Sequence, residues 1–278
     1  MATAQATKLT EDRVNANLGN PFSWFLDSET ILVKMLPKNR QPLLDSKKDL
    51  PTGPIISNTS GEKSQNRTYP DMLKNKNDEA NFENCITSEL YKVKLNGDAV
   101  LFKDAAMFGG EKISPDGNYI MLRTIQKRFS YVVALNRFPF KTVVYDLSGR
   151  EIKTVNEVPL NEIMPKGFMA VRKGKREMAW RNDKPATLSY VVALDEGDPA
   201  NKVDFRDEVF LWDAPFDKDA SSLAKTPQRF SDIIWGNDNL AVLSEEWYDT
   251  RNTKTYLINP SNPSQQPKLI TDRNSHDV

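Results

Sequence analysis

Residues 113–122 read Ile-Ser-Pro-Asp-Gly-Asn-Tyr-Ile-Met-Leu. A polar turn with Pro-Asp-Gly lies between two apolar runs, a pattern typical of a β-hairpin because these residues favour a tight chain reversal. Three other segments have the same organisation. They are residues 24–33, residues 170–180 around Lys173-Gly174-Lys175, and residues 233–243.

A further β-rich run that ends in a turn follows each predicted hairpin. These runs are residues 90–97, 143–149, 209–215 and 256–260, and short exit strands such as Lys268–Thr271 come after them. The hexapeptide Ser130-Tyr-Val-Val-Ala-Leu135 also recurs unchanged at Ser189–Leu194. Units of four strands at intervals of roughly 50 to 65 residues are typical of β-propeller blades.

We therefore predict an all-β chain, a β-propeller of about four to five blades, each with four antiparallel strands. One blade is too thin to bury both of its faces, so blades must stack on one another. A polar insertion at about residues 37–88 interrupts the first interval, and we expect a short helix at residues 71–84 within it.

Composition excludes several classes of protein. The 278 residues carry 38 Lys plus Arg and 38 Asp plus Glu, which excludes a broadly basic surface, so no nucleic-acid partner is expected. The apolar runs are much shorter than the ~20 residues of a membrane span, so none is expected. Residues 1–7 have no signal-peptide pattern. The single Cys85 excludes an internal disulfide and a cysteine-type zinc site.

The residues needed for common catalytic sites are missing from the chain. His276, in a polar tail, is the only histidine, and no Gly-x-Ser-x-Gly nucleophile elbow or phosphate-binding loop is present. Without a core histidine, we interpret Cys85 as a small buried apolar residue. We therefore predict no catalytic residue, no metal and no cofactor in this chain.

An ordered set of short motifs resembles the glutamyl endopeptidase branch of the prolyl oligopeptidase family. The resemblance runs from about residue 22 to 274. Its motifs include Arg67-Thr-Tyr-Pro-Asp-Met-Leu73, Ser114-Pro-Asp-Gly117, Arg137-Phe-Pro139, Trp180-Arg-Asn-Asp183, Ala193-Leu-Asp-Glu-Gly-Asp-Pro199, Arg206-Asp207, Trp235-Gly236, Glu246-Trp-Tyr248, Arg251-Asn252 and Asp272-Arg-Asn274.

The resemblance implies a serine peptidase of two parts, in which a propeller of seven or eight blades restricts access to a C-terminal α/β-hydrolase domain. We expect residues 1–278 to be a propeller domain or a fragment of one, with the hydrolase domain absent. No catalytic residue carries over, so the chain alone is not expected to be an enzyme. For a bacterial parent, the resemblance implies a periplasmic or secreted location.

Two functions remain open at this point. The first is a noncatalytic module of a serine peptidase that selects peptides for cleavage after Glu, with the hydrolase domain of the parent chain and peptide substrates as partners. The alternative is a stand-alone propeller that binds a protein or peptide. Self-association is also expected, because open blade faces would expose apolar residues. We expect these to be Ile120, Leu122, Val242 and Leu243.

Four arginines are candidates for substrate binding, since a guanidinium binds an acidic side chain in bidentate fashion. They are Arg181, Arg206, Arg229 and Arg251. The alternative is that they form ion pairs between blades with Asp183, Asp207 and Asp249.

Two further features allow both a functional and a structural interpretation. Four tryptophans either line a peptide tunnel or pack within blades: Trp180, Trp212, Trp235 and Trp247. Asp195, Glu196 and Asp198 around Gly197 are a candidate calcium loop, but the remaining ligands of such a loop are missing. We favour the structural interpretation in both cases.

Overall fold

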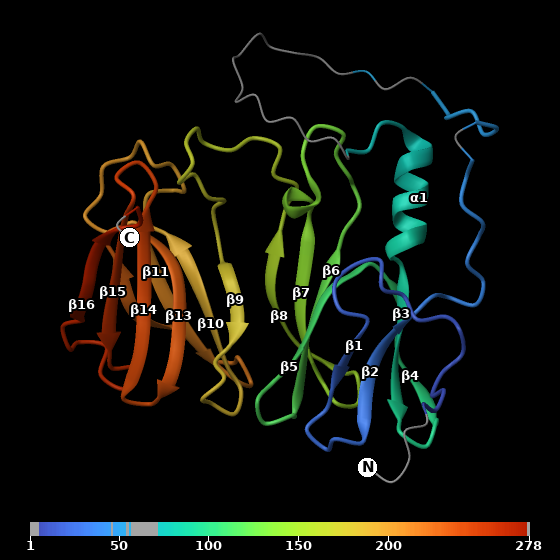
Figure 1. The fold of residues 1–278 in the computed structure, drawn as a ribbon, viewed down its shortest axis with the longest axis horizontal. Coiled ribbons are helices and arrows are strands. Elements are labelled where there is room, and N and C mark those ends of the chain that lie inside the picture. Colours follow the sequence, from blue (N-terminus) through green and yellow to red (C-terminus); the bar gives the residue numbers. More distant parts are fainter. Residues whose placement is uncertain (1–5, 46, 54–55, 57–71, 277–278) are drawn as a thin grey trace. The chain divides into compact units, whose positions relative to one another are not determined.

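The computed structural model of the chain describes residues 6–45, 47–53, 56 and 72–276. Two compact units are present. Unit 1 comprises residues 1–113 and 119–162, and unit 2 comprises residues 114–118 and 163–278. The sequence-coloured ribbon follows unit 1 from blue to green and unit 2 from yellow to red (Figure 1).

Unit 1 holds two four-stranded antiparallel sheets, each with its strands in chain order. The first sheet contains β1 (Phe22–Trp24), β2 (Thr30–Met35), β3 (Ser88–Lys94) and β4 (Ala99–Ala106). The second contains β5 (Phe108–Ile113), β6 (Tyr119–Ile125), β7 (Phe140–Asp146) and β8 (Glu151–Val158).

Unit 2 repeats the same arrangement. Its first sheet contains β9 (Arg176–Trp180), β10 (Thr187–Ala193), β11 (Asp207–Asp213) and β12 (Ser221–Thr226). Its second contains β13 (Arg229–Asn237), β14 (Leu240–Trp247), β15 (Asn252–Ile258) and β16 (Lys268–Asn274). The predicted class, an all-β chain of four-stranded antiparallel propeller blades, is confirmed.

One of the four predicted hairpins is wrong. Residues 170–175 form no strand, and the hairpin of this sheet reverses instead at residues 181–186, between β9 and β10. The backbone N–H of Val171 donates to the carbonyl of Gly197, so the segment before β9 bonds to a distant loop and not to β9 itself. The other three hairpins correspond to β1–β2, β5–β6 and β13–β14.

The repeated hexapeptide adopts two different conformations. Ser189–Leu194 lies in and just after β10, where β9 and β11 pair with it on both sides. The identical Ser130–Leu135 lies in the irregular connection between β6 and β7. There Val133 is buried in a cluster with Ile86, Met107, Ile125 and Phe138. Tertiary contacts therefore decide the conformation of this sequence, and the repeat does not mark equivalent strands.

The insertion contains one helix in its described part. Helix α1 spans Lys76–Ile86, shorter at its start than the predicted residues 71–84, and residue 71 itself lies outside the described residues. The Asn75 side chain caps α1 by accepting from the backbone N–H of Asp78 at 2.9 Å. Within the part of the chain that the structure describes, no helix has the length and apolar character to cross a membrane.

Each unit has an apolar core between its two sheets. In unit 1, the core contains Leu32, Leu90, Phe108, Ile120 and Leu122, and in unit 2 it contains Val191, Val209, Leu223, Ala241, Leu243 and Ile258. The expectation that Ile120, Leu122 and Leu243 lie on open faces is therefore wrong, since each is at most 1% exposed. Only Val242 of that set is partly exposed.

The outer faces of the two units differ. In unit 1, the N-terminal segment covers one face of the first sheet, because Leu9 packs against Ile31, Val33 and Met35. In unit 2, Ile234 on β13 is 61% exposed. Its register partner Val242 on β14 is also partly exposed.

Candidate functional site

The antiparallel registers of unit 2 place three of the four candidate arginines at one end of its strands. Arg206 precedes β11, Arg229 begins β13 and Arg251 precedes β15. The registers pair Arg229 with Glu246 and Glu246 with Thr253, two residues after Arg251, and Arg229 donates to the carbonyl of Arg206. We call this end the arginine end. It includes the connections at residues 163–175, 194–206, 227–228 and 248–251. Arg181 follows β9 and lies at the opposite end.

Arg229 is the centre of a buried ionic network at the arginine end. Its Nη2 lies 2.7 Å from Oδ2 of Asp195, and its Nη1 lies 3.1 Å from Oδ1 of Asp207. Arg176 adds a second cation, 2.5 Å from the same Asp207 oxygen. The side chains of Arg229, Asp195 and Asp207 are at most 2% exposed. Buried charges are tolerated only when they are paired in this way.

Arg206 extends the network toward the surface. Its Nη1 lies 2.9 Å from Oδ2 of Asp195 and also donates to the carbonyls of Pro199 and Asn201. Its guanidinium lies over the Trp247 ring, with Cζ 4.3 Å from the centroid. These contacts give Arg206 a structural role in holding the loop between β10 and β11.

The network also fixes the connection that precedes β9. Arg229 Nε donates to the carbonyl of Met169 at 2.8 Å. Oδ1 of Asp195 accepts from the backbone N–H of Gly197, and the carbonyl of Gly197 accepts from Val171. Gly197 has φ +77°, and a Cβ there would lie 2.1 Å from the Val171 carbonyl oxygen, so only glycine allows this close approach.

The pKa of Asp195 reflects this environment. Burial raises the pKa, but hydrogen bonds from Arg229 and Arg206 to the carboxylate outweigh burial and hold the pKa below its ordinary value. The carboxylate therefore stays ionised and acts as a fixed anion for two guanidinium groups. A permanently paired carboxylate of this kind is suited to holding loops in place and not to transferring protons.

Arg251 differs from the other three candidates. Among the described residues no carboxylate pairs with its guanidinium, which instead lies over the Tyr248 ring with Cζ 3.7 Å from the centroid. Tyr248 in turn stacks on Phe168, with ring centroids 4.3 Å apart and an interplanar angle of 29°. Phe168 is 64% exposed and Tyr248 is 37% exposed.

Arg181 pairs mainly with Asp183 at the opposite end, and Asp238 in the turn between β13 and β14 lies 4.0 Å from its Nη2. Its Nε and Nη2 lie 3.0 and 2.6 Å from the two carboxylate oxygens of Asp183, and Cζ lies 4.3 Å from the Trp235 ring centroid. The structure thus gives carboxylate partners to Arg181, Arg206 and Arg229. For Asp249, the third acid named with the arginines, the described residues show no ion pair. Substrate binding by the four arginines stays a prediction.

The candidate calcium loop is engaged in other contacts. Asp195 holds the two arginines, Glu196 lies 2.9 Å from Lys173, and Asp198 accepts from the backbone N–H of Ala200. In the described part of the chain, no three acidic, histidine or cysteine side chains form a cluster that could hold a metal. Two of the four candidate tryptophans pack on Phe216: the ring centroid of Trp212 lies 5.4 Å from that of Phe216, and the centroid of Trp180 lies 6.2 Å from it.

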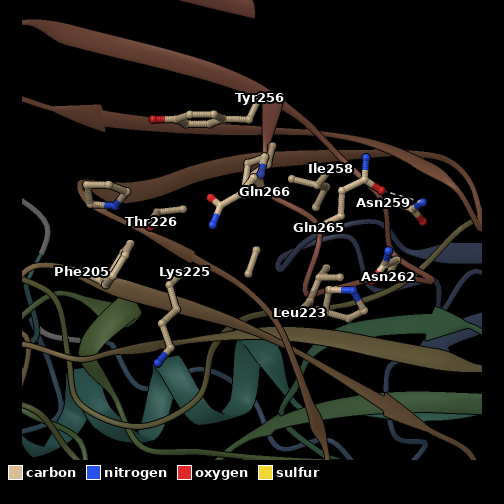
Figure 2. Close-up of a pocket in the computed structure, with 15 residues that line it drawn as sticks. Phe205, Leu223, Lys225, Thr226, Tyr256, Ile258, Asn259, Asn262, Gln265 and Gln266 are labelled. Atoms are coloured by element: carbon tan, nitrogen blue, oxygen red, sulfur yellow. Dashed lines mark hydrogen bonds between the residues drawn. The ribbon is translucent and has the colours of Figure 1, made fainter. Parts of the chain in front are cut away.

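A cavity of about 300 Å³ lies between the two sheets of unit 2. Figure 2 shows Leu223 and Ile258 at its apolar part, with the carboxamides of Asn259, Asn262 and Gln265 along one side. Tyr256 lines the cavity, and its hydroxyl donates to Oε1 of the fully buried Glu245 at 2.9 Å. Burial, followed by this contact with Glu245, raises the pKa of Tyr256 well above its ordinary value.

The cavity provides apolar surface, carboxamides and one lysine, Lys225. These groups form hydrogen bonds and bury apolar atoms, and none of them is a nucleophile activated by a neighbouring base. The cavity therefore has the chemistry of a binding site. Sequence reasoning missed it, because its residues come from β12, β14, β15 and residues 259–267, which are brought together only by the fold.

The chain is similar to two plant proteins that are named as peptidases. Over 260 residues the chain is 35% identical to a protein of Oryza sativa subsp. japonica called probable glutamyl endopeptidase, chloroplastic. Over 261 residues it is 33% identical to a protein of Arabidopsis thaliana with the same name. The resemblance to the glutamyl endopeptidases is confirmed. Both alignments cover 92% of this chain.

The chain spans about a quarter of the length of these glutamyl endopeptidases, 28% of the rice protein and 27% of the Arabidopsis protein. Among solved structures, the acylaminoacyl peptidase of Pyrococcus horikoshii is 11% identical with a TM-score of 0.45, and the match covers 90% of this chain and 31% of that one. No protein-family profile matches the chain.

Proposed function

We propose that the chain is a noncatalytic propeller module of a serine-type peptidase, which restricts and selects the peptides that reach a separate α/β-hydrolase domain. The observation that supports this most strongly is the 35% identity over 92% of the chain to a probable glutamyl endopeptidase. The residues agree with it, because the only histidine is His276 and no nucleophile elbow is present.

The relatives' name also suggests the specificity of the parent protein. Both plant proteins are called glutamyl endopeptidases, so the proposed substrates are peptides cleaved after Glu. The proposed partners are these peptides and the hydrolase domain of the parent chain. A periplasmic or secreted location in a bacterial parent remains part of this proposal.

A stand-alone binding propeller is the second candidate. The cavity between the sheets of unit 2 favours it, because a binding site of about 300 Å³ is useful without any catalytic domain. The reading frame of the complete gene distinguishes the two candidates. A Gly-x-Ser-x-Gly elbow with a later Asp and His, downstream of codon 278, supports the peptidase, whereas a frame without them supports the stand-alone propeller.

A fluorophosphonate probe, which reacts with activated serines, tests the proposal on the proteins themselves. The complete polypeptide should be labelled, and the 278-residue chain should not. Covalent labelling of a serine within the 278-residue chain would contradict the noncatalytic role. Absence of labelling in the complete, folded polypeptide would contradict the serine peptidase.

A further inference from the structure

We propose that the stack of Phe168, Tyr248 and Arg251, in which the two rings are exposed and the arginine is partly buried, binds the acidic side chain of a peptide, with Arg251 contacting the carboxylate. We call these three residues the stack. The inference deepens the proposed function and rests on it only for the idea that the ligand is a peptide.

The four candidate arginines differ in whether a carboxylate of the fold already binds them. A guanidinium that already binds a carboxylate in the fold has little capacity left for a second one, and this applies to Arg181, Arg206 and Arg229. Arg251 has no such partner among the described residues. It is the candidate whose charge is available to an anionic ligand.

The stack has a geometry that suits a carboxylate ligand. Arg251 lies over one aromatic ring, Tyr248, which itself packs on Phe168. Stacking holds a guanidinium through its flat face and leaves its edge, which carries the N–H donors, free for a carboxylate. The exposed rings beside it can cover the aliphatic part of a Glu side chain. One surface can therefore contact both the carboxylate and the methylene groups of this ligand.

Hydrogen bonds to the backbone hold the chain around Arg251 in place. Arg251 has φ +56°, in the left-handed region that residues other than glycine rarely adopt. Its carbonyl accepts from the backbone N–H of Ser275 at 2.6 Å, and Asn274 donates to the carbonyl of Thr250. Non-glycine residues in this region are enriched at ligand-binding sites, where the surrounding structure holds them.

The buried ionic network around Arg229 also holds Phe168 in place. Phe168 is the direct neighbour of Met169, whose carbonyl accepts from Arg229. The charges inside unit 2 therefore position the exposed ring on which Tyr248 stacks. A preformed site of this kind loses little entropy when a ligand binds.

A binding assay on the 278-residue chain tests the inference. The probe is a dansyl-labelled, C-terminally amidated peptide with one Glu as its only acidic group, and its counterpart has Gln at that position. By fluorescence anisotropy at low salt, the chain should bind the Glu peptide at least fivefold more tightly. Arg251→Met should remove this preference, and Arg251→Lys should restore part of it, because Lys keeps the charge but loses the planar fork.

Matched variants separate a local effect from general ones. Arg150→Met removes an exposed arginine from unit 1 and should leave the Glu preference unchanged. At φ +56° a Met side chain causes no more backbone strain than Arg, so the Arg251→Met variant should stay folded. Circular dichroism checks this. Tyr248→Leu, which removes the supporting ring but no charge, should weaken Glu-peptide binding several-fold.

A Glu preference that survives Arg251→Met in a folded chain, or a wild-type chain with no Glu preference, would overturn this inference. Neither result involves hydrolysis, so each bears on the stack and not on the proposed peptidase. Conversely, a labelled serine within this chain would contradict the proposed function and leave the binding result untouched.

Discussion

Arg229 Nη2 lies 2.7 Å from Asp195 Oδ2, although the two residues are 34 positions apart, Arg229 at the start of β13 and Asp195 in the loop after β10. Both side chains are at most 2% exposed. This pair joins the strand β13 to the loop after β10, and through the Met169 carbonyl it also holds the connection before β9. The buried charges at the arginine end thus hold its connections together, whereas a ligand-binding role is proposed only for Arg251 in the stack.

Arg229→Met should lower the free energy of unfolding by about 3–5 kcal/mol, because it leaves Asp195 and Asp207 buried with fewer cations. Urea denaturation followed by tryptophan fluorescence measures this. Lys173→Ala is the matched control, since it removes a cation from the exposed pair with Glu196 and should cost about 0.5 kcal/mol or less. Equal effects of the two substitutions would show that the buried network does not stabilise the fold.

The stability of the chain should fall in acid partly through Asp195. The folded pKa of this carboxyl is depressed, so its contribution is complete above the unfolded pKa of about 3.9 and is lost as the pH falls through the folded value. Urea denaturation at a series of pH values from 6 to 2 measures the loss. In Asp195→Asn the loss over this range should be smaller, and an identical pH dependence would contradict the assignment.

Gly197→Ala should destabilise the chain more than Gly174→Ala. Both glycines have positive φ, +77° and +80°, so the backbone cost of about 1–2 kcal/mol is shared. Only at position 197 would the new Cβ meet a backbone atom, the Val171 carbonyl oxygen, whereas at 174 the nearest atom is the flexible end of Arg172 at 4.0 Å. Thermal unfolding of both variants measures the difference. Similar melting temperatures would show that the close approach is unimportant.

Self-association through the open face of unit 2 stays a prediction. Ile234 is the most exposed apolar residue that β13 contributes there. Light scattering over a concentration series should show dimers or larger species, and Ile234→Lys should reduce them because a charge disfavours burial of this face. A wild-type chain that stays monomeric at high concentration and binds no hydrophobic dye would contradict this prediction.

Local patterns in the sequence were sufficient for most of the fold. Pro115-Asp-Gly117 and Asn237-Asp-Asn239 each lie between apolar runs, and both hairpins form as predicted. The hairpin expected at Lys173-Gly174-Lys175 does not form. The backbone N–H of Val171 instead donates to the carbonyl of Gly197, a partner that cannot be recognised from the local sequence. The repeated hexapeptide lies in and just after a strand at residues 189–194 but forms no strand at 130–135, because the residues that surround the two copies in space differ.

The candidate site was predicted less completely than the fold. The sequence identified the four arginines as a set, but it did not distinguish Arg251 from Arg229. That distinction depends on Asp195 and Met169, which lie 34 and 60 residues before Arg229. Phe168 had no signal of its own, because a single aromatic residue in a loop is recognised as part of a stack only when Tyr248 lies against it.

We propose that this chain selects peptides and does not cleave them. The most direct test incubates the purified chain with the Glu peptide and follows the peptide by mass spectrometry while anisotropy reports binding. We predict that the peptide binds, in an Arg251-dependent manner, and is recovered intact. Cleavage after Glu at a rate that is abolished by substitution of a serine within the chain would contradict the account.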